Sequence, residues 1–344
     1  MRSRFTDADT PPVYCCRSAS EYNSTIKRLV ESTDVVLEVG CQLNELTHSI
    51  ARVAHSLIGV DIDRKAPSTA DKKALGFYRQ SACSTFHNVR MHIVDVADLR
   101  ALTSHCPDTV SLIVVDANVV LGNDLPFEVL ATLRTLTRLF DPRALVVKSR
   151  ALASLQHQLR PAPSPRPLPA PHSADKPRRL VPISAANLVH EYRKAALAAL
   201  ELVPPGACAL EIGAHVGETT ALIHRALEER GAGGRCVGID VSGAIVDRAK
   251  ARHPSVPFEV ADAWDPLSLL RSLERSGCGV GAKPALLLID VGGLSGASGT
   301  LDALALLRVL LSVFAPELRA VVIKSSCMRT LARALKPAQS DRAC

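Results

Sequence analysis

Leu210-Glu211-Ile212-Gly213, followed by Gly238-Ile239-Asp240, decides the fold of this chain because the pattern occurs twice. The first copy reads Leu37-Glu38-Val39-Gly40 and then Gly59-Val60-Asp61. Chance matches would not recur at several sites in one order, so the sequence predicts an internal duplication. The further paired landmarks are Asp95 and Asp262, Val115-Asp116 and Ile289-Asp290, and Val146-Val147-Lys148-Ser149 and Val322-Ile323-Lys324-Ser325.

Short apolar runs alternate with helical stretches in both halves of the chain. Continuous apolar strands separated by helices of about 10–15 residues are typical of parallel sheets covered on both faces. The sequence therefore predicts an α/β protein with two tandem Rossmann-like, doubly wound parallel sheets of about five strands each. The expected strands are 35–39, 56–60, 91–94, 112–115 and 145–147 in the first half, and 208–212, 235–239, 258–260, 285–289 and 320–323 in the second.

A proline-rich join separates the two expected domains, 1–158 and 184–344, as a linker over 159–183. Proline recurs at every second position of much of this stretch, which favours an extended polyproline-like spacer. Between Pro142 and Lys194 there are ten Lys and Arg residues against two acids, whereas the whole chain has a net charge of +7. We interpret the join either as a solvated spacer or as a basic arm that contacts phosphates of structured RNA or a ribonucleoprotein.

Composition excludes several classes of protein. A hydrophobic content of 47% excludes disorder over most of the 344 residues. No apolar run reaches the roughly 18–20 residues of a membrane span, so we expect no membrane insertion. The ten cysteines have no Cys-x-x-Cys spacing, which indicates a reducing compartment and neither disulfides nor a metal site. The expected compartment is the cytoplasm, with an organelle matrix left open.

The chemistry-bearing residues follow the strands of the second half. In doubly wound sheets, ligands bind beyond the carboxyl ends of the strands. A glycine turn after the first strand lets a ligand approach the backbone, and the next helix begins there. A carboxylate ending the second strand can accept both hydroxyls of a ribose, and one ending the third can accept a hydrogen bond from an adenine amine. These residues are Glu211, Gly213 and Gly217 in the turn, then Asp240 and Asp262.

Trp264, the single tryptophan, stands two residues beyond Asp262. Its ring could stack on the adenine. The alternative is a hydrophobic side chain that covers the edge of the sheet, and the sequence leaves both interpretations open.

This set of residues resembles the class I S-adenosylmethionine-dependent methyltransferases. The resemblance implies S-adenosyl-L-methionine as cofactor, with Glu211, Gly213 and Gly217 near its methionine part, Asp240 at the ribose and Asp262 at the adenine. A nicotinamide dehydrogenase would require Gly-x-Gly-x-x-Gly, which is absent here. In the first copy Asn44 stands where Gly217 stands, so we expect the second domain to be the cofactor binder.

Asp290 and Lys324, together with Lys194, resemble part of the Lys-Asp-Lys-Glu set of FtsJ-type RNA 2′-O-methyltransferases. That resemblance implies that a lysine activates a ribose hydroxyl. The alternative is that Lys324 is a surface charge at the end of a strand. The sequence after Asp290 lacks the Asn/Asp-Pro-Pro-aromatic motif of enzymes that methylate base amines, and it lacks the Pro-Cys of pyrimidine carbon-5 enzymes.

Both halves depart from the methyltransferase pattern by stopping after the fifth strand, without the usual β6–β7 hairpin. Each sheet would then have an uncovered edge, and such edges are normally paired or hidden. We therefore expect the domains to pair with each other, or with a protein partner, along these edges. Two functions remain: a methyltransferase with an undetermined acceptor, for which structured RNA is one candidate, and a non-catalytic tandem scaffold.

Overall fold

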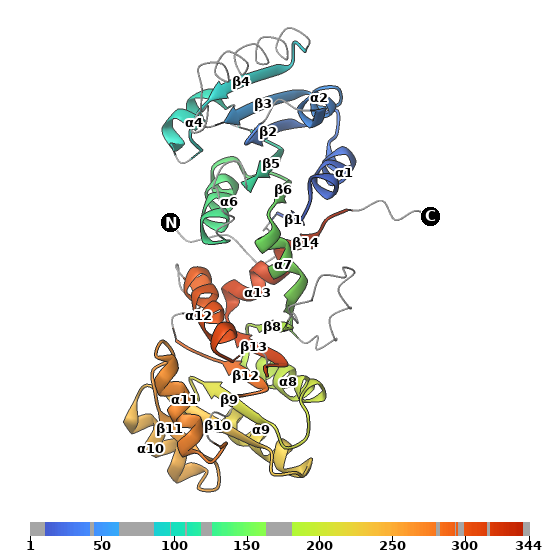
Figure 1. The fold of residues 1–344 in the computed structure, drawn as a ribbon. Helices are drawn as coiled ribbons and strands as arrows, with labels where there is room; N and C mark the ends of the chain where they lie inside the picture. The colour runs from blue at the N-terminus through green and yellow to red at the C-terminus, as the bar shows by residue number, and fades with distance from the viewer. Residues whose placement is uncertain are drawn as a thin grey trace. The chain divides into compact units, whose positions relative to one another are not determined.

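Two α/β units make up the chain in the computed structural model (Figure 1). One unit comprises Met1–Gln156 together with Ala334–Cys344, and the other comprises His157–Arg333. No helix among the described residues is both long and apolar enough to cross a membrane. The structure describes residues 11–41, 45–61, 86–96, 98–106, 109–117, 126–162, 181–279, 283–292, 294, 299–314 and 317–339.

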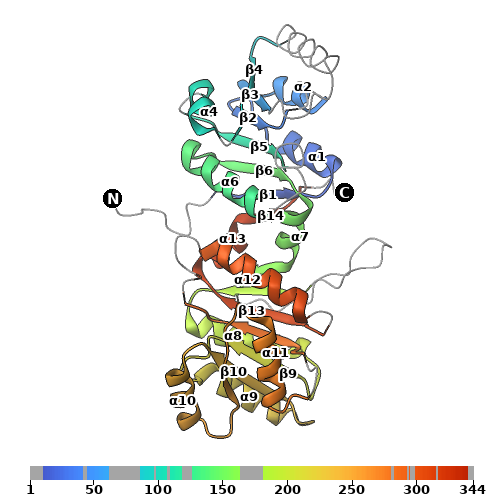
Figure 2. The same cartoon turned by 60° about the vertical axis from the view of Figure 1, so that its left-hand side comes forward.

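The first unit contains a seven-stranded sheet in the order β14-β1-β6-β5-β2-β3-β4, which can be followed along the labels of Figure 2. Every strand pair in this sheet is parallel. The strands are β1 (Val13–Cys16), β2 (Val35–Val39), β3 (Ser56–Asp61), β4 (Val89–Ile93), β5 (Leu112–Asp116), β6 (Ala144–Lys148) and β14 (Leu335–Pro337). The helices are α1 (Ala19–Leu29), α2 (Glu45–Ala51), α4 (Leu99–His105), α6 (Pro126–Phe140) and α7 (Arg150–Gln158), which ends just inside the second unit.

The second unit contains a seven-stranded parallel sheet in the order β11-β10-β9-β12-β13-β8-β7. Its strands are β7 (Leu159–Pro161), β8 (Ile183–Ala186), β9 (Cys208–Ile212), β10 (Arg235–Asp240), β11 (Phe258–Val260), β12 (Leu286–Ile289) and β13 (Ala320–Lys324). Its helices are α8 (Val189–Ala199), the 3₁₀ helix η1 (Leu200–Leu202), α9 (Glu218–Glu229), α10 (Gly243–Arg252), α11 (Pro266–Arg275), α12 (Gly299–Phe314) and α13 (Ser326–Ala334).

The two sheets have the same strand order when the strands are matched along the sequence. The predicted α/β class with two parallel sheets is confirmed, and the ten expected strands are present with ends that differ by at most two residues. The predicted count of five strands per sheet is wrong, because each sheet has seven. Four short strands were not expected from the sequence. β1 and β8 precede α1 and α8, and β7 and β14 follow α7 and α13. In each sheet these strands lie beyond the fifth expected strand, where the methyltransferase hairpin would lie, and they are parallel.

The last strand of each sheet comes from the other half of the sequence. β14 follows the second half but pairs with β1 of the first sheet, where Val13 lies opposite Leu335. β7 follows the first half but pairs with β8 of the second sheet, where Leu159 lies opposite Ile183. Leu159 and Leu335 are 2% and 5% exposed, so each strand buries its leucine in the unit that it joins. We call this arrangement the strand exchange.

Further contacts fix both exchanged segments. The backbone N–H of Ala162 donates to the carbonyl of Ala185 (2.8 Å) in the second unit. In the first unit, the N–H of Gln339 donates to the hydroxyl of Thr25 (3.0 Å), and the hydroxyl of Ser24 donates to the carbonyl of Gln339 (3.3 Å). The exchanged segments therefore contact helix α1 as well as strands β1 and β8.

The exchange gives domain limits that differ from those expected from the sequence. The sequence predicted domains over 1–158 and 184–344, with a linker over 159–183. In the structure, Ala334–Cys344 belong to the first unit, and β7 lies inside the expected linker. Residues 163–180, which carry most of the proline run, lie outside the described residues.

The serine of the repeated Lys-Ser pair has a structural role in both units. Ser149 and Ser325 are fully buried, and each hydroxyl accepts a hydrogen bond from the third residue along, at 3.1 Å from Leu152 and 3.2 Å from Met328. A serine in this position caps the first turn of a helix. The serines thus start α7 and α13, and the preceding lysines are left at the carboxyl ends of β6 and β13.

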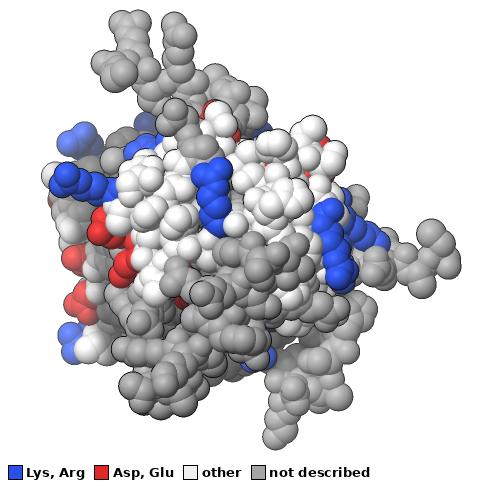
Figure 3. All heavy atoms as spheres, turned by 90° about the horizontal axis from the view of Figure 1, so that it is seen from above, with Lys and Arg blue, Asp and Glu red and all other residues white. Residues whose placement is uncertain are grey.

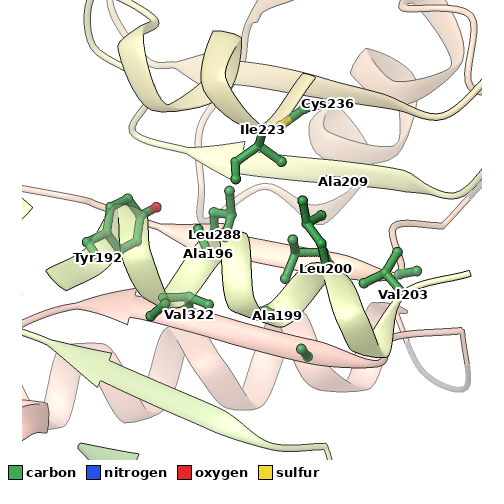
Figure 4. Packing of buried hydrophobic residues seen from close by; sticks show 14 of the residues in the cluster. Tyr192, Ala196, Ala199, Leu200, Val203, Ala209, Ile223, Cys236, Leu288 and Val322 are labelled. Carbon is green, nitrogen blue, oxygen red and sulfur yellow. The ribbon is translucent and has the colours of Figure 1, made fainter. Parts of the chain in front are cut away.

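The core of the second unit lies between α8, α9 and the sheet (Figure 4). Helix α8 places Tyr192, Ala196 and Ala199 against the sheet residues Leu288 and Val322, all 2% exposed or less. Small alanines let the helix approach the sheet closely, and burial of this apolar surface stabilises the unit. This face of the second sheet is therefore closely packed.

Candidate functional site

The turn between β9 and α9 is built from backbone conformations that favour glycine. Gly213, His215 and Gly217 all have positive φ, at +81°, +48° and +85°. A Cβ on Gly213 would stand 2.1 Å from the carbonyl oxygen of Asp290, and one on Gly217 would stand 2.4 Å from the ring of Phe258. The glycines predicted to make room for a ligand are thus required by the packing of the protein itself.

His215 is the strained member of this turn. A non-glycine residue in the left-handed region is uncommon, and such strain is concentrated at functional sites. The turn is held in place by the N–H groups of Gly213 and Ala214, which both donate to the carbonyl of Ile239 (2.8 and 2.9 Å). The side chain of His215 is exposed at the carboxyl end of the sheet.

Glu211 lies beneath this turn, not at the surface. Its side chain is 2% exposed and accepts hydrogen bonds from Thr220 (2.5 Å) on α9 and Tyr192 (3.3 Å) on α8. Burial raises the pKa of Glu211 to about 8. In the first unit, Glu38 is likewise buried, accepts from Thr47 (3.2 Å), and has a pKa raised by burial to about 7. Glu211 therefore joins α8 and α9 to β9 from within the core.

Asp240 ends β10 and faces the turn. Its Oδ2 accepts the N–H of His215 (3.2 Å), and its Oδ1 accepts the N–H of Ser242 (3.1 Å). A carboxylate has about four acceptor positions, so these two bonds leave about two for a ligand. The side chain is partly exposed and fixed from both sides, which suits it to accept a pair of hydroxyl groups.

Exposed apolar residues follow or end the same strands, β10 and β11, as the carboxylates Asp240 and Asp262. Val260 lies opposite Asp240 in the strand pairing and is 47% exposed, and Trp264 is 48% exposed. Asp262 is exposed, and its Oδ1 accepts the N–H of Trp264 (2.9 Å), which orients this loop. Apolar surface beside fixed polar groups is typical of small-molecule sites. The arrangement fits a flat ring with a hydroxylated substituent.

Val241 is an exposed apolar residue beside Asp240 that was not expected from the sequence. It follows Asp240 directly and is 72% exposed, the highest exposure among the large apolar side chains of the described residues. The sequence contained an indication of this exposure, since Val241 directly follows the carboxylate that ends the strand and so lies outside the buried part of the sheet.

Asp290 and Lys324 are brought together by neighbouring strands. The Nζ of Lys324 lies 2.8 and 2.9 Å from the two carboxylate oxygens of Asp290, and the side chains are 27% and 29% exposed. The first unit repeats this ion pair between Lys148 and Asp116 at the ends of β6 and β5. A lysine held in this way presents a fixed positive charge at the carboxyl end of the sheet.

Lys194 is not part of this pair. On α8 the buried face contains Tyr192, Ala195 and Ala199, and Lys194 is exposed on the opposite face. It lines a surface groove together with Leu188 and other residues of the same helix. The structure therefore brings together two of the three residues of the predicted catalytic set.

In the first unit, the turn after β2 is only partly described. Gly40 has φ +79°, and the N–H groups of Gly40 and Cys41 donate to the carbonyl of Val60 (2.9 and 3.4 Å), as Gly213 and Ala214 do in the second unit. Asn44, which was expected to crowd the ligand, lies outside the described residues.

The expected basic contact to phosphates stays a prediction. Arg166, Lys176, Arg178 and Arg179 lie outside the described residues. On the face shown in Figure 3, the described Lys and Arg side chains stand apart and form no continuous patch. Among the described residues, there is no cluster of three His, Cys, Asp or Glu side chains that could hold a metal.

The chain has only low similarity to known proteins in the comparisons. No family model matches the chain, and no curated protein matches it. One similar solved structure is a TehB-like SAM-dependent methyltransferase from Corynebacterium glutamicum, with 21% identity, a TM-score of 0.25 and coverage of 36% of this chain. The match spans 56% of that protein. Another is phosphoethanolamine N-methyltransferase 1 of Haemonchus contortus in complex with phosphoethanolamine and S-adenosylhomocysteine, with 11% identity, a TM-score of 0.28, and coverage of 83% of this chain and 76% of the other.

Proposed function

We propose that the chain is an S-adenosylmethionine-dependent methyltransferase whose second unit holds the cofactor. The observation that carries the proposal is Asp240, a partly exposed carboxylate fixed by two backbone N–H groups with acceptor positions to spare. Val241 and Trp264 offer apolar surface beside it for an adenine ring. Asp262 follows the neighbouring strand and is the acceptor for the adenine amine.

We further propose that the two units arose by duplication of one such domain. The shared strand order, the two Lys–Asp ion pairs and the two buried glutamates beneath the turns support this origin. The first unit would then be a supporting copy.

Bound S-adenosylmethionine would supply an electrophilic methyl group. Asp290 follows β12 and Lys324 ends β13. In the sheet order these strands lie on the other side of β9 from β10 and β11, and we place the methyl acceptor there. The fixed ammonium of Lys324 would stabilise the negative charge that develops on an acceptor hydroxyl as its proton passes to solvent water. Asp290 orients the lysine. The acceptor class that we propose is a ribose hydroxyl of structured RNA, in contact with the basic linker.

Isothermal titration of the full chain with S-adenosylmethionine tests cofactor binding. We expect saturable heat for the wild type and at least a tenfold weaker affinity for Asp240→Asn, because the amide cannot accept two hydroxyls on fixed oxygens. Asp247→Asn, an exposed change on α10, is the matched control and should bind like the wild type. Asp61→Asn makes the same change at the end of β3 and reports whether the first unit binds as well.

A specific feature favours the alternative, a non-catalytic scaffold. The packing requirements of Gly213 and Gly217 and the burial of Glu211 explain these residues without any ligand. If the wild type gave no binding heat with S-adenosylmethionine or S-adenosylhomocysteine, the enzyme proposal would fail and the scaffold would remain. If it binds, transfer of labelled methyl groups to structured RNA, and not to protein, is the result expected for the proposed acceptor.

A further inference from the structure

Two cysteines of the second unit meet at the amino-terminal ends of its strands, away from the candidate site. Cys208 opens β9, whereas the glycine turn follows the other end of that strand. Cys278 follows α11 and lies 70 residues further along the chain. Their sulfur atoms are 2.7 Å apart, and both residues are partly exposed.

The local backbone holds both cysteines in place. After α11, Gly277 has φ +74°, and the N–H groups of Gly277 and Cys278 donate to the carbonyls of Glu274 and Leu273 (3.1 Å each). This glycine-containing helix end turns the chain back toward the sheet. The carbonyl of Cys208 accepts the N–H of Ala285 (2.8 Å), which fixes it at the start of β9.

The hydrogen bond between the two thiols makes them unequal, and Arg235 lies close by. Its guanidinium donates to the carbonyl of Ser276 (3.2 Å) and lies against Gly277. The hydrogen bond between the two sulfur atoms, aided by the positive charge of Arg235, lowers the pKa of the Cys278 thiol. The same hydrogen bond, together with burial, raises the pKa of Cys208. A thiolate is the reactive form of cysteine, so Cys278 is the nucleophile of the pair.

We propose that Cys208 and Cys278 are a redox modification site, which closes to a reversible disulfide in the presence of a peroxide. The Cys278 thiolate attacks one oxygen of hydrogen peroxide, so that a sulfur–oxygen bond forms, the oxygen–oxygen bond breaks and hydroxide leaves as water after taking a proton. The sulfur of Cys208 then attacks the sulfenic acid. The sulfur–sulfur bond forms, the sulfur–oxygen bond breaks and a second water leaves. In sum, two thiols and one peroxide give one disulfide and two waters.

The segment between these cysteines contains β9, α9, β10, α10, β11 and α11, and with them Gly213, Asp240 and Asp262. A cross-link between its ends restricts the unfolded chain and stabilises the folded unit. The first unit has no such pair at these positions, because Val35 stands at the start of β2 where Cys208 opens β9, although Cys106 follows α4. The inference stands independently of the proposed enzyme activity.

The test uses the full chain, treated with a small excess of hydrogen peroxide, alkylated and digested without reducing agent. We expect a Cys208–Cys278 cross-linked peptide that disappears after dithiothreitol. The oxidised chain should also show a rise of several degrees in the unfolding temperature of the second unit. Both effects should vanish in Cys278→Ser and persist in Cys106→Ser, the matched control.

Three results would overturn the proposal. These are the absence of the cross-linked peptide from the folded wild type, an unfolding temperature that does not change on oxidation, and a temperature rise that persists in Cys278→Ser. To exclude misfolding of the serine variant, its circular dichroism should match that of the reduced wild type. Cys208→Ser should trap Cys278 as a sulfenic acid that reacts with dimedone.

Discussion

Replacement of Glu211 by glutamine should remove a pH-dependent loss of stability from the second unit. Glu211 is buried between α8 and α9, and burial raises its pKa from 4.5 to about 8. A carboxyl whose pKa is higher in the folded than in the unfolded state favours folding when it is protonated. Its stabilising effect is therefore complete below the unfolded pKa and is lost as the pH rises through the folded pKa.

The size of this loss in the free energy of unfolding follows from the difference between the folded and unfolded pKa of Glu211. Between about pH 5 and pH 8 the folded state binds up to one proton more than the unfolded state, so the wild type should lose roughly 1.4 kcal/mol per pH unit through this residue. Across this interval the loss is at most roughly 4 kcal/mol. Glutamine resembles the protonated carboxyl and can keep the hydrogen bonds to Tyr192 and Thr220. The free energy of unfolding of Glu211→Gln should therefore rise relative to the wild type as the pH increases.

Urea denaturation followed by tryptophan fluorescence is the assay. Trp264 is the single tryptophan of the chain and lies in the second unit, so its signal reports on that unit. Glu229→Gln, an exposed change on α9, is the control and should show a difference from the wild type that does not vary with pH. A difference for Glu211→Gln that stayed constant from pH 5 to pH 8, or that changed in the opposite direction, would refute the reasoning.

The remaining predictions concern the ion pair, the turn and the strand exchange. Lys324→Met should abolish methyl transfer but keep cofactor binding in calorimetry, and it should cost no more than about 1 kcal/mol of stability because the pair with Asp290 is partly exposed. Gly213→Ala should cost about 3 kcal/mol in urea denaturation, since it combines a positive φ with a clash against backbone. Leu335→Ala should destabilise the first unit by about 2 kcal/mol in hydrogen exchange of β1, with little effect on β9. Cleavage at a protease site inserted into 163–180 should leave one species of unchanged mass in size-exclusion chromatography with light scattering, and two half-size species would contradict the exchange.

The sequence predicted the central strands because their residues are buried on both faces. β2 and β9 match the expected runs to the residue, because each is a short aliphatic run that contains one glutamate and is followed directly by a glycine. β1 and β8 are four-residue strands, and the second, Ile-Ser-Ala-Ala, has little β-propensity. Their pairing is decided by tertiary context.

The two exchanged strands share a short sequence pattern. β7 reads Leu-Arg-Pro and β14 reads Leu-Lys-Pro, each directly after an amphipathic helix. The repeat of this tripeptide indicated a shared structural role, but a proline at the start of a proline run favoured a linker. Nothing in the sequence specifies that each strand joins the sheet of the other half.

The candidate site was predicted in part. Asp290 and Lys324 come together because parallel neighbours end at one edge of a sheet, a rule that needs no side-chain detail. Lys194 does not join them, because it lies on the face of α8 opposite to Tyr192, Ala195 and Ala199. The proximity of Cys208 and Cys278 depends on the packing of the whole second unit, so no local pattern predicts it.

The strand exchange also constrains how the chain can fold while it is being synthesised. Domains generally fold as units and in order as they emerge from the ribosome. Here the strand that completes the first sheet is translated only after the entire second half, so the earlier unit must wait with β1 as an open edge. The later unit has its donated strand β7 in place from the start. The half that is translated first is therefore the half that finishes last, and during synthesis its edge is the part of the chain most in need of protection from aggregation.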